Sequence, residues 1–184
     1  MITKTDLVWM TVIDKRMDWC REQARLRTER AIQIGRGRRN ASPPNDSPAA
    51  YTAALLGLLC EAAAMIYLSP VTWLYEVRDD VRGLHDLEHN GAKIDVKGCG
   101  GHGYHLVIQP GEPPDWIYVL ATAPAPPIVC LRGWCWGWNG MVDEYRGTNN
   151  PTVAGPDGFW IPQHAPILRS MRELRVHLHG RGAR

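Results

Sequence analysis

The order of apolar and polar positions divides the chain into a helical first part and a strand-rich middle. Apolar residues recur near helical spacing from about Thr5 to Gln33, which predicts one or two helices. An almost wholly apolar run predicts a buried helix from roughly Ala49 to Leu68, ended by Ser69-Pro70. The basic stretch between them, Gly35 to Pro48, is rich in Gly, Pro, Asn and Ser and predicts a loop.

Short strand-like runs follow, separated by Gly-rich or Pro-rich turns. The predicted strands are Val71 to Val77, Asp86 to His89, Ala92 to Lys97, Tyr104 to Gln109, Trp116 to Ala121 and Ile128 to Trp134. After Asn139 the pattern is irregular, with a helical patch from Ile167 to Leu174 before a basic tail. Helices, then a cluster of strands, then a short helix predict an α/β or α+β fold.

The length of 184 residues and the hydrophobic content of 45% suit one globular domain with a sizeable core. Within this single domain we distinguish an N-terminal helical arm with its basic loop (1–48), a core that carries the candidate chemistry (49–138) and an irregular C-terminal extension with a short helix (139–184). The cysteines include no C-x-x-C pair and no secretory signal opens the chain, so we expect free thiols in a reducing cytoplasm.

The apolar run that predicts the buried helix is almost long enough to span a bilayer. Gly57 and Glu61 interrupt it, and a carboxylate at a bilayer centre costs about 2.5–3.5 kcal/mol. We therefore expect a helix in a globular core and no membrane partner.

The run from His85 to Gly98 contains two incompatible signatures. His85, Glu88 and His89 match H-x-x-E-H, a zinc-protease motif that requires both histidines on one face of a helix. Asn90-Gly91 follows at once and, between strand-like residues, is the strongest short-range signal for a hairpin with a two-residue type I′ turn. The sequence therefore favours the hairpin and leaves the zinc protease as the weaker alternative.

The predicted hairpin determines which side chains face each other. The expected cross-strand pairs are Glu88 with Lys93, Leu87 with Ile94, and Asp86 with Asp95. Two directly opposed aspartates repel each other, and Lys97 projects from the same face as Asp95. Two carboxylates beside an ammonium suit a hard divalent cation such as Mg²⁺, with the lysine orienting or helping to deprotonate an attacking water. The alternative is a surface hairpin whose charges are solvated.

Together with the apolar helix, this hairpin resembles the PD-(D/E)xK nuclease superfamily, and more narrowly its small phage- and bacterium-type members. In that family a G-x-x-x-E helix precedes the strands, and Gly57 and Glu61 have this spacing. The likeness covers roughly residues 50–138 and includes IDVKG at Ile94 to Gly98. It departs at His85, where the family usually has Pro, and at Asp95, where the middle acid is Asp rather than Glu.

The resemblance implies a restriction-endonuclease-like core, in which helices flank a central mixed β-sheet, and hydrolysis of phosphodiester bonds with Mg²⁺ or Mn²⁺. The residues that it assigns to the metal are Asp86, Asp95, Glu61 and the main-chain carbonyl of Val96. Lys97 would position the nucleophile, which makes Lys97, Asp95, Asp86 and Glu61 the catalytic set. Glu61 has the alternative of reaching solvent at the helix edge, and Asp79 and Asp80 replace the first acid if the register differs.

Basic and aromatic residues are further candidates for DNA contact. The arginines of the predicted loop, Arg36, Arg38 and Arg39, offer planar forks that match phosphate. They end a cluster that begins at Arg21 and also fits a solvated helix face, because acidic residues lie among its members. Tyr104 and His105, after a Gly-rich loop, contact the scissile strand or serve a structural role. Trp134, Trp136 and Trp138 alternate, which fits core packing or a dimer interface better than base stacking.

The sequence thus predicts a small Mg²⁺-dependent deoxyribonuclease in the cytoplasm of a bacterium or a phage-infected host, with an endonuclease favoured. A homodimer is expected because the chain has no separate recognition domain and a two-fold assembly suits cutting both strands. The alternatives are a structure-specific junction resolvase and a non-catalytic nucleic-acid-binding or inhibitor protein on the same fold.

Overall fold

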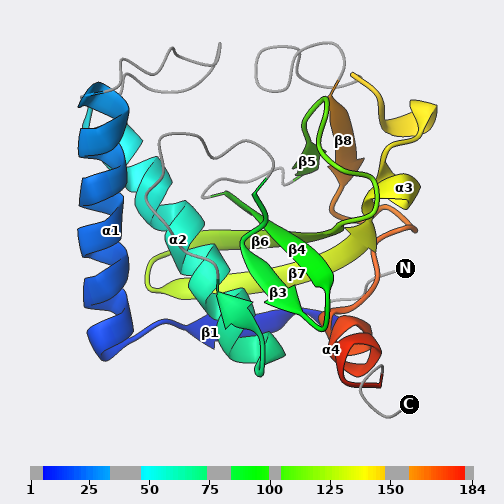
Figure 1. The fold of residues 1–184 in the computed structure, drawn as a ribbon, viewed down its shortest axis with the longest axis horizontal. Coiled ribbons are helices and arrows are strands. Elements are labelled where there is room, and N and C mark those ends of the chain that lie inside the picture. Colours follow the sequence, from blue (N-terminus) through cyan, green and yellow to red (C-terminus); the bar gives the residue numbers. More distant parts are fainter. Residues whose placement is uncertain (1–5, 34–46, 74–83, 100–104, 148–157, 181–184) are drawn as a thin grey trace.

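The structure, a computed structural model, describes residues 6–33, 47–73, 84–99, 105–147 and 158–180. Its first elements are β1 (Val8–Thr11), α1 (Asp14–Gln33) and α2 (Pro48–Leu68) (Figure 1). The strands that follow are β2 (Thr72–Trp73), β3 (Leu87–His89), β4 (Ala92–Cys99), β5 (His105–Ile108), β6 (Ile117–Ala125) and β7 (Ile128–Trp136). The last elements are α3 (Gly137–Gly140), the 3₁₀ helix η2 (Asp143–Tyr145), β8 (Phe159–Pro162) and α4 (Met171–Gly180).

Six of the strands form one mixed sheet in the order β1-β7-β6-β4-β3-β2. β4 and β6 are parallel, and the other neighbouring strands are antiparallel. β5 and β8 form a separate antiparallel pair. In Figure 1, α2 runs diagonally across the sheet with α1 beside it, and the β5–β8 pair stands at the opposite corner from α1. The predicted mixed sheet with flanking helices is therefore confirmed.

The two faces of the sheet carry separate cores. On one face, Ile117 of β6 and Ile94 and Val96 of β4 pack with apolar residues of α1, α2 and α4. On the other face, Tyr118 of β6 packs with β5, β8 and the segment before α4. Burial of a large apolar side chain contributes about 1.5–3 kcal/mol, so each core holds its layer firmly. Because successive strand residues point to opposite faces, Ile94 and Val96 face α2 and Asp95 faces away from it.

α2 is the predicted apolar helix. The Ser47 hydroxyl accepts a hydrogen bond from the NH of Ala50 (3.2 Å) and Pro48 occupies the first turn, so the helix begins with a regular cap. Among the described helices it is the one whose length and composition would suffice to cross a membrane. Its residues from Leu58 to Ala64 are buried, and the helix contacts α1, β4, β6 and β7. It is a core helix of this fold, as predicted.

Three segments differ from the prediction. Val8–Thr11 is a strand rather than the start of a helix, because its main chain pairs with β7, distant in sequence. The last helix is Met171–Gly180 rather than Ile167–Leu174, and β8 lies in the part predicted to be irregular. Of the strand predicted at Val71 to Val77, the structure describes only the portion up to Trp73.

Candidate active site

The hairpin formed by β3 and β4 has the predicted turn. Asn90 (φ 48°) and Gly91 (φ 76°) both have positive φ, which is the type I′ geometry that Asn-Gly favours. Leu87 pairs with Ile94, and the next two pairs follow the predicted register. The hairpin prediction is confirmed.

The same geometry rules out the helical zinc-protease motif. Because Leu87–His89 is a strand, His85 and His89 do not share a helix face. His85 Nε2 lies 3.0 Å from Glu88 Oε2, and the His85 ring packs edge-on against Trp116. The histidines of this run therefore hold the hairpin to its neighbours.

Asp86 lies immediately before β3 and is held to β4 by two hydrogen bonds. Its NH donates to the carbonyl of Ile94 (2.9 Å), and its Oδ2 accepts the NH of Val96 (2.7 Å). The ladder ends at Leu87, so the predicted pairing of Asp86 directly opposite Asp95 is wrong. The reason is that Asp86 lies in a bend, where its carboxylate takes the place of a main-chain acceptor.

Asp86 and two other carboxylates nevertheless influence one another. Burial raises the pKa of Asp86 well above its ordinary value, and the negative charges of Glu61 and Asp95 raise it further. The Val96 NH and the Lys97 ammonium act in the opposite direction without offsetting these causes. A divalent cation beside these acids would relieve the repulsion and favour their ionised forms.

The ammonium of Lys97 is fixed between two carboxylates. Its Nζ lies 2.7 Å from Asp95 Oδ2 and 2.6 Å from Glu112 Oε1. Burial alone would lower the pKa of Lys97, but the charges and hydrogen bonds of Asp95 and Glu112 outweigh burial and raise it. Lys97 therefore stays protonated at neutral pH and can donate hydrogen bonds, whereas a role as a base is disfavoured.

Glu112 is a site residue that the sequence analysis missed. It lies in the turn between β5 and β6, where its Oε2 accepts the NH of Gln109 (2.9 Å) while its Oε1 accepts from Lys97. The Tyr118 hydroxyl donates to the carbonyl of Pro113 (2.9 Å) and ties the same turn to the sheet. No local motif marks this glutamate, because its contact with Lys97 depends on the parallel pairing of β4 and β6.

Glu61 is buried on α2, so the alternative of a side chain that reaches solvent at the helix edge is wrong. Its Oε1 lies 3.4 Å from both Nη atoms of Arg27 on α1. The approach of α2 to β4 requires a glycine at position 98: a Cβ there would lie 2.9 Å from Cys60 Cβ and 3.3 Å from Gly57 Cα, whereas a Cβ on Gly57 would meet nothing within 4 Å. Gly98 lets α2 approach β4 closely, and the charge of Glu61 on α2 acts on Asp86.

Glu61, Asp86 and Asp95 do not form a three-carboxylate metal site. In the described ranges, no three His, Cys, Asp or Glu side chains are placed to share one metal ion. Glu61, turned toward Arg27, thus does not converge with Asp86 and Asp95 on one point. Mg²⁺ is usually held by one or two carboxylates, waters and substrate phosphate, so a Mg²⁺ site at this hairpin would use Asp86 and Asp95 without Glu61. The Val96 NH points to Asp86. The main-chain NH and carbonyl of one strand residue point to the same side of the strand, so the Val96 carbonyl faces the same edge of β4.

Most of the predicted DNA-contacting residues lie outside the described ranges, namely Arg36, Arg38, Arg39 and Tyr104, as do the substitute acids Asp79 and Asp80. His105 begins β5, is half-buried, and packs its ring edge-on against Trp160 at a centroid distance of 6.0 Å. This contact favours the structural role for His105.

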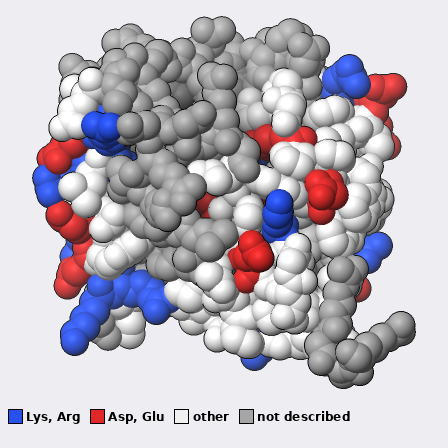
Figure 2. Space-filling model, viewed as in Figure 1, with Lys and Arg blue, Asp and Glu red and all other residues white. Residues whose placement is uncertain are grey.

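The arginines of α1 are largely paired with acids of the same helix. Arg21 contacts Asp18 at 3.1 Å, and Arg25 contacts both Glu22 and Glu29. In Figure 2, acidic and basic side chains accordingly alternate along the edge that α1 forms. This part of the arginine cluster is a solvated helix face rather than a free phosphate-binding surface.

The three tryptophans differ in their surroundings. Trp134 is buried in the core, which confirms core packing for this residue. Trp138 lies in α3, is 50% exposed, and stacks on Trp136 at a centroid distance of 4.4 Å.

Comparison of the chain with family models, with curated proteins and with solved structures finds no match.

Proposed function

We propose that this chain is a metal-dependent nuclease that hydrolyses phosphodiester bonds in DNA, with the site arrangement of the PD-(D/E)xK superfamily. The observation that carries the proposal is the β3–β4 hairpin. It supports two mutually repelling acids, Asp86 and Asp95, and a lysine ammonium hydrogen-bonded to one of them. Solvated surface charges would not account for a buried Asp95 or for an Asp86 whose pKa is raised by burial.

Asp86, Asp95 and the carbonyl of Val96 are the groups that would hold Mg²⁺ or Mn²⁺. When bound, such an ion polarises a phosphoryl oxygen and lowers the pKa of water. Asp86 and Asp95 supply the negative charge that attracts it, and the hydrogen bond from the Val96 NH keeps Asp86 in place. The negative charge of Glu61 disfavours the ionised form of Asp86. A bound cation would offset this repulsion, so Glu61 would increase the electrostatic gain from metal binding.

Lys97 donates hydrogen bonds to the reacting groups. Because Asp95 and Glu112 raise the pKa of Lys97, it carries a positive charge throughout the neutral range. A fixed cation of this kind stabilises the negative charge that develops on the phosphate or orients the attacking water. Glu112 is a positioning residue that holds this ammonium through a second ion pair, in addition to that with Asp95.

The test is a cleavage assay with labelled linear, circular, branched and single-stranded DNA and with RNA, each with Mg²⁺, Mn²⁺ or EDTA. We expect metal-dependent cleavage of at least one DNA. Asp95→Asn and Lys97→Ala should each lower kcat by about 10²–10³-fold, the loss typical of removing one fixed electrostatic group from an active site. Lys93→Ala is the matched control, because Lys93 lies on the same strand but pairs across it with Glu88.

Different outcomes separate the alternatives. Preferential cutting of the branched DNA would identify a junction resolvase. Retention of DNA without cleavage in any divalent metal would overturn the proposal in favour of a binding protein. The expected homodimer is tested by light scattering of the same preparation.

A further inference from the structure

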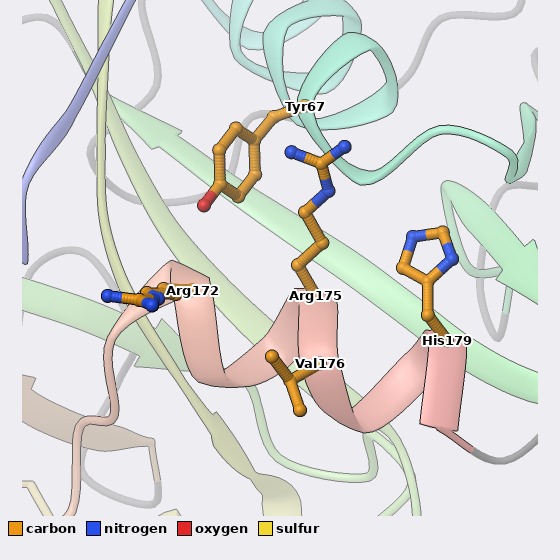
Figure 3. Close-up of a pocket in the computed structure, with 5 residues that line it drawn as sticks. All are labelled: Tyr67, Arg172, Arg175, Val176 and His179. Atoms are coloured by element: carbon orange, nitrogen blue, oxygen red, sulfur yellow. The ribbon is translucent and has the colours of Figure 1, made fainter.

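A second group of basic side chains lies where α4 approaches the end of α2. There an open pocket of about 490 Å³ is lined by Tyr67, Arg172, Arg175, Val176 and His179 (Figure 3). In Figure 3, Arg175 and His179 extend from α4 on the side that faces α2 and Tyr67. The pocket is separate from the acids of the candidate active site.

The pocket is built from one face of α4 and one aromatic ring of α2. Arg172, Arg175 and His179 are spaced by three and four residues, which places them on the same helix face. The Arg175 guanidinium lies over the Tyr67 ring, 5.6 Å from its centroid, and this contact fixes the position of the arginine. The ring centroids of His179 and His89 are 5.7 Å apart, so the pocket adjoins the tip of the β3–β4 hairpin.

The positive charge of this pocket is not neutralised in the part of the chain that the structure describes. There, neither Arg172 nor Arg175 forms an ion pair with a carboxylate, in contrast to Arg21 and Arg25 of α1. The one acid of α4, Glu173, accepts the NH of Ser170 (3.1 Å) in a helix cap. Exposed guanidinium groups without a carboxylate partner are suited to bind phosphate, often with two parallel hydrogen bonds.

We infer that this pocket binds a phosphate of the DNA strand that enters the active site. The inference rests on the proposed nuclease function and assigns it a second contact with the substrate. Asp86 lies immediately before β3 and His89 ends it, so the site and the pocket adjoin opposite ends of the same strand.

The experiment measures DNA binding by fluorescence anisotropy in EDTA, with a labelled 20-nucleotide single strand and the corresponding duplex, over a series of salt concentrations. The test variant carries Arg172→Gln and Arg175→Gln, which keep much of the side-chain stem and the helix propensity. The control carries Arg21→Gln and Arg25→Gln, which change the net charge equally at paired positions. Thermal melting of each variant verifies folding, and Arg172→Gln alone serves if the double variant does not fold.

We expect the test variant to bind about tenfold more weakly than wild type and the control to bind as wild type does. The slope of log K against log salt should fall in magnitude by about 0.9 for the duplex or about 0.7 for the single strand, the loss of one phosphate contact. An unchanged slope, an equal loss in the control, or no binding of either DNA by the wild type overturns the inference. Salt-dependent binding lost only in the test variant, together with no cleavage in any metal, supports the pocket and overturns the nuclease.

Discussion

Glu112→Gln is the substitution that tests most directly how Lys97 is held. It removes one of the two carboxylates that contact the ammonium, at 2.6 Å, and leaves Asp95 at 2.7 Å. Glutamine retains an oxygen that can accept the NH of Gln109, so the turn should keep its shape. Hydrogen bonds to charged groups contribute about 1.5–3 kcal/mol. Because 23% of the Lys97 side chain and 22% of the Glu112 side chain are exposed, we expect the lower part of this range, about 1.5–2 kcal/mol.

The loss has a defined pH dependence. Asp95 and Glu112 raise the pKa of Lys97 in the folded state, so their stabilisation is complete below the ordinary lysine pKa and disappears as the pH rises through the folded value. The variant should therefore be less stable than wild type from neutral pH to about pH 10, and the difference should shrink above it. At neutral pH the melting temperature should fall by about 3–8 °C for a domain of this size.

Two measurements separate positioning from simple destabilisation. The chain has four lysines, so the Lys97 Cε signal can be resolved by NMR after labelling with ¹³C-lysine, and its titration should move to lower pH in Glu112→Gln. In the cleavage assay we expect kcat to fall about tenfold with little change in KM, and the alkaline limb of the pH profile to move to lower pH. Glu88→Gln, which removes a carboxylate of the same hairpin that contacts His85, is the control. A Lys97 titration identical in wild type and Glu112→Gln would refute this account of the site.

Five further substitutions test the scaffold by denaturant unfolding. Because burial and the neighbouring acids raise the pKa of Asp86, its ionisation costs folded-state stability above the ordinary aspartate pKa. Asp86→Asn should be at least as stable as wild type at pH 7, with the advantage lost towards pH 4; a deficit of equal size at both pH values contradicts this. Gly98→Ala places a methyl group 2.9 Å from Cys60 and should lower the free energy of unfolding by about 1–3 kcal/mol. Gly57→Ala, with open space around it, should raise the free energy of unfolding by about 0.5–1 kcal/mol. Equal effects of the two alanines would show that α2 and β4 are not in close contact. Gly91→Ala, at φ 76°, should cost about 1–2 kcal/mol and Asn90→Gly almost nothing, unless the turn is not of type I′.

The parts of the fold that could be read from the sequence are those decided by neighbouring residues. Asn90-Gly91 sets the turn of its hairpin by local backbone preference, and the apolar run after Ser47 carries its own helix cap. The start of α4 was also readable, because Ser170 and Glu173 form a reciprocal cap of the S-x-x-E type, with bonds of 3.1 and 3.3 Å. The helix predicted from the apolar pattern begins too early, because this cap determines where α4 starts.

The parts that were missed depend on partners far along the chain. Val8–Thr11 becomes a strand through pairing with β7, and no pattern within these residues announces that partner. Glu112 reaches Lys97 only because β6 lies parallel to β4, an arrangement that a hairpin signal does not contain. The bend at Asp86 likewise replaced an expected cross-strand pair with a side-chain bond to Val96. Local chemistry thus indicated Asp86, Asp95 and Lys97 as candidates, and tertiary pairing determined how they are held.

The bond from the Val96 NH to Asp86 has a practical consequence for capturing this protein with its substrate. Asp86 anchors the edge of the hairpin as well as offering a ligand, so replacing it by a residue without an acceptor would disturb the scaffold and the chemistry together. Among the described polar contacts, the Asp95 carboxylate has one partner, Lys97. Asn at position 95 would keep an acceptor for this lysine. An inactive trap for crystallography is therefore better made with Asn at Asp95 or Asp86 than with Ala at Asp86.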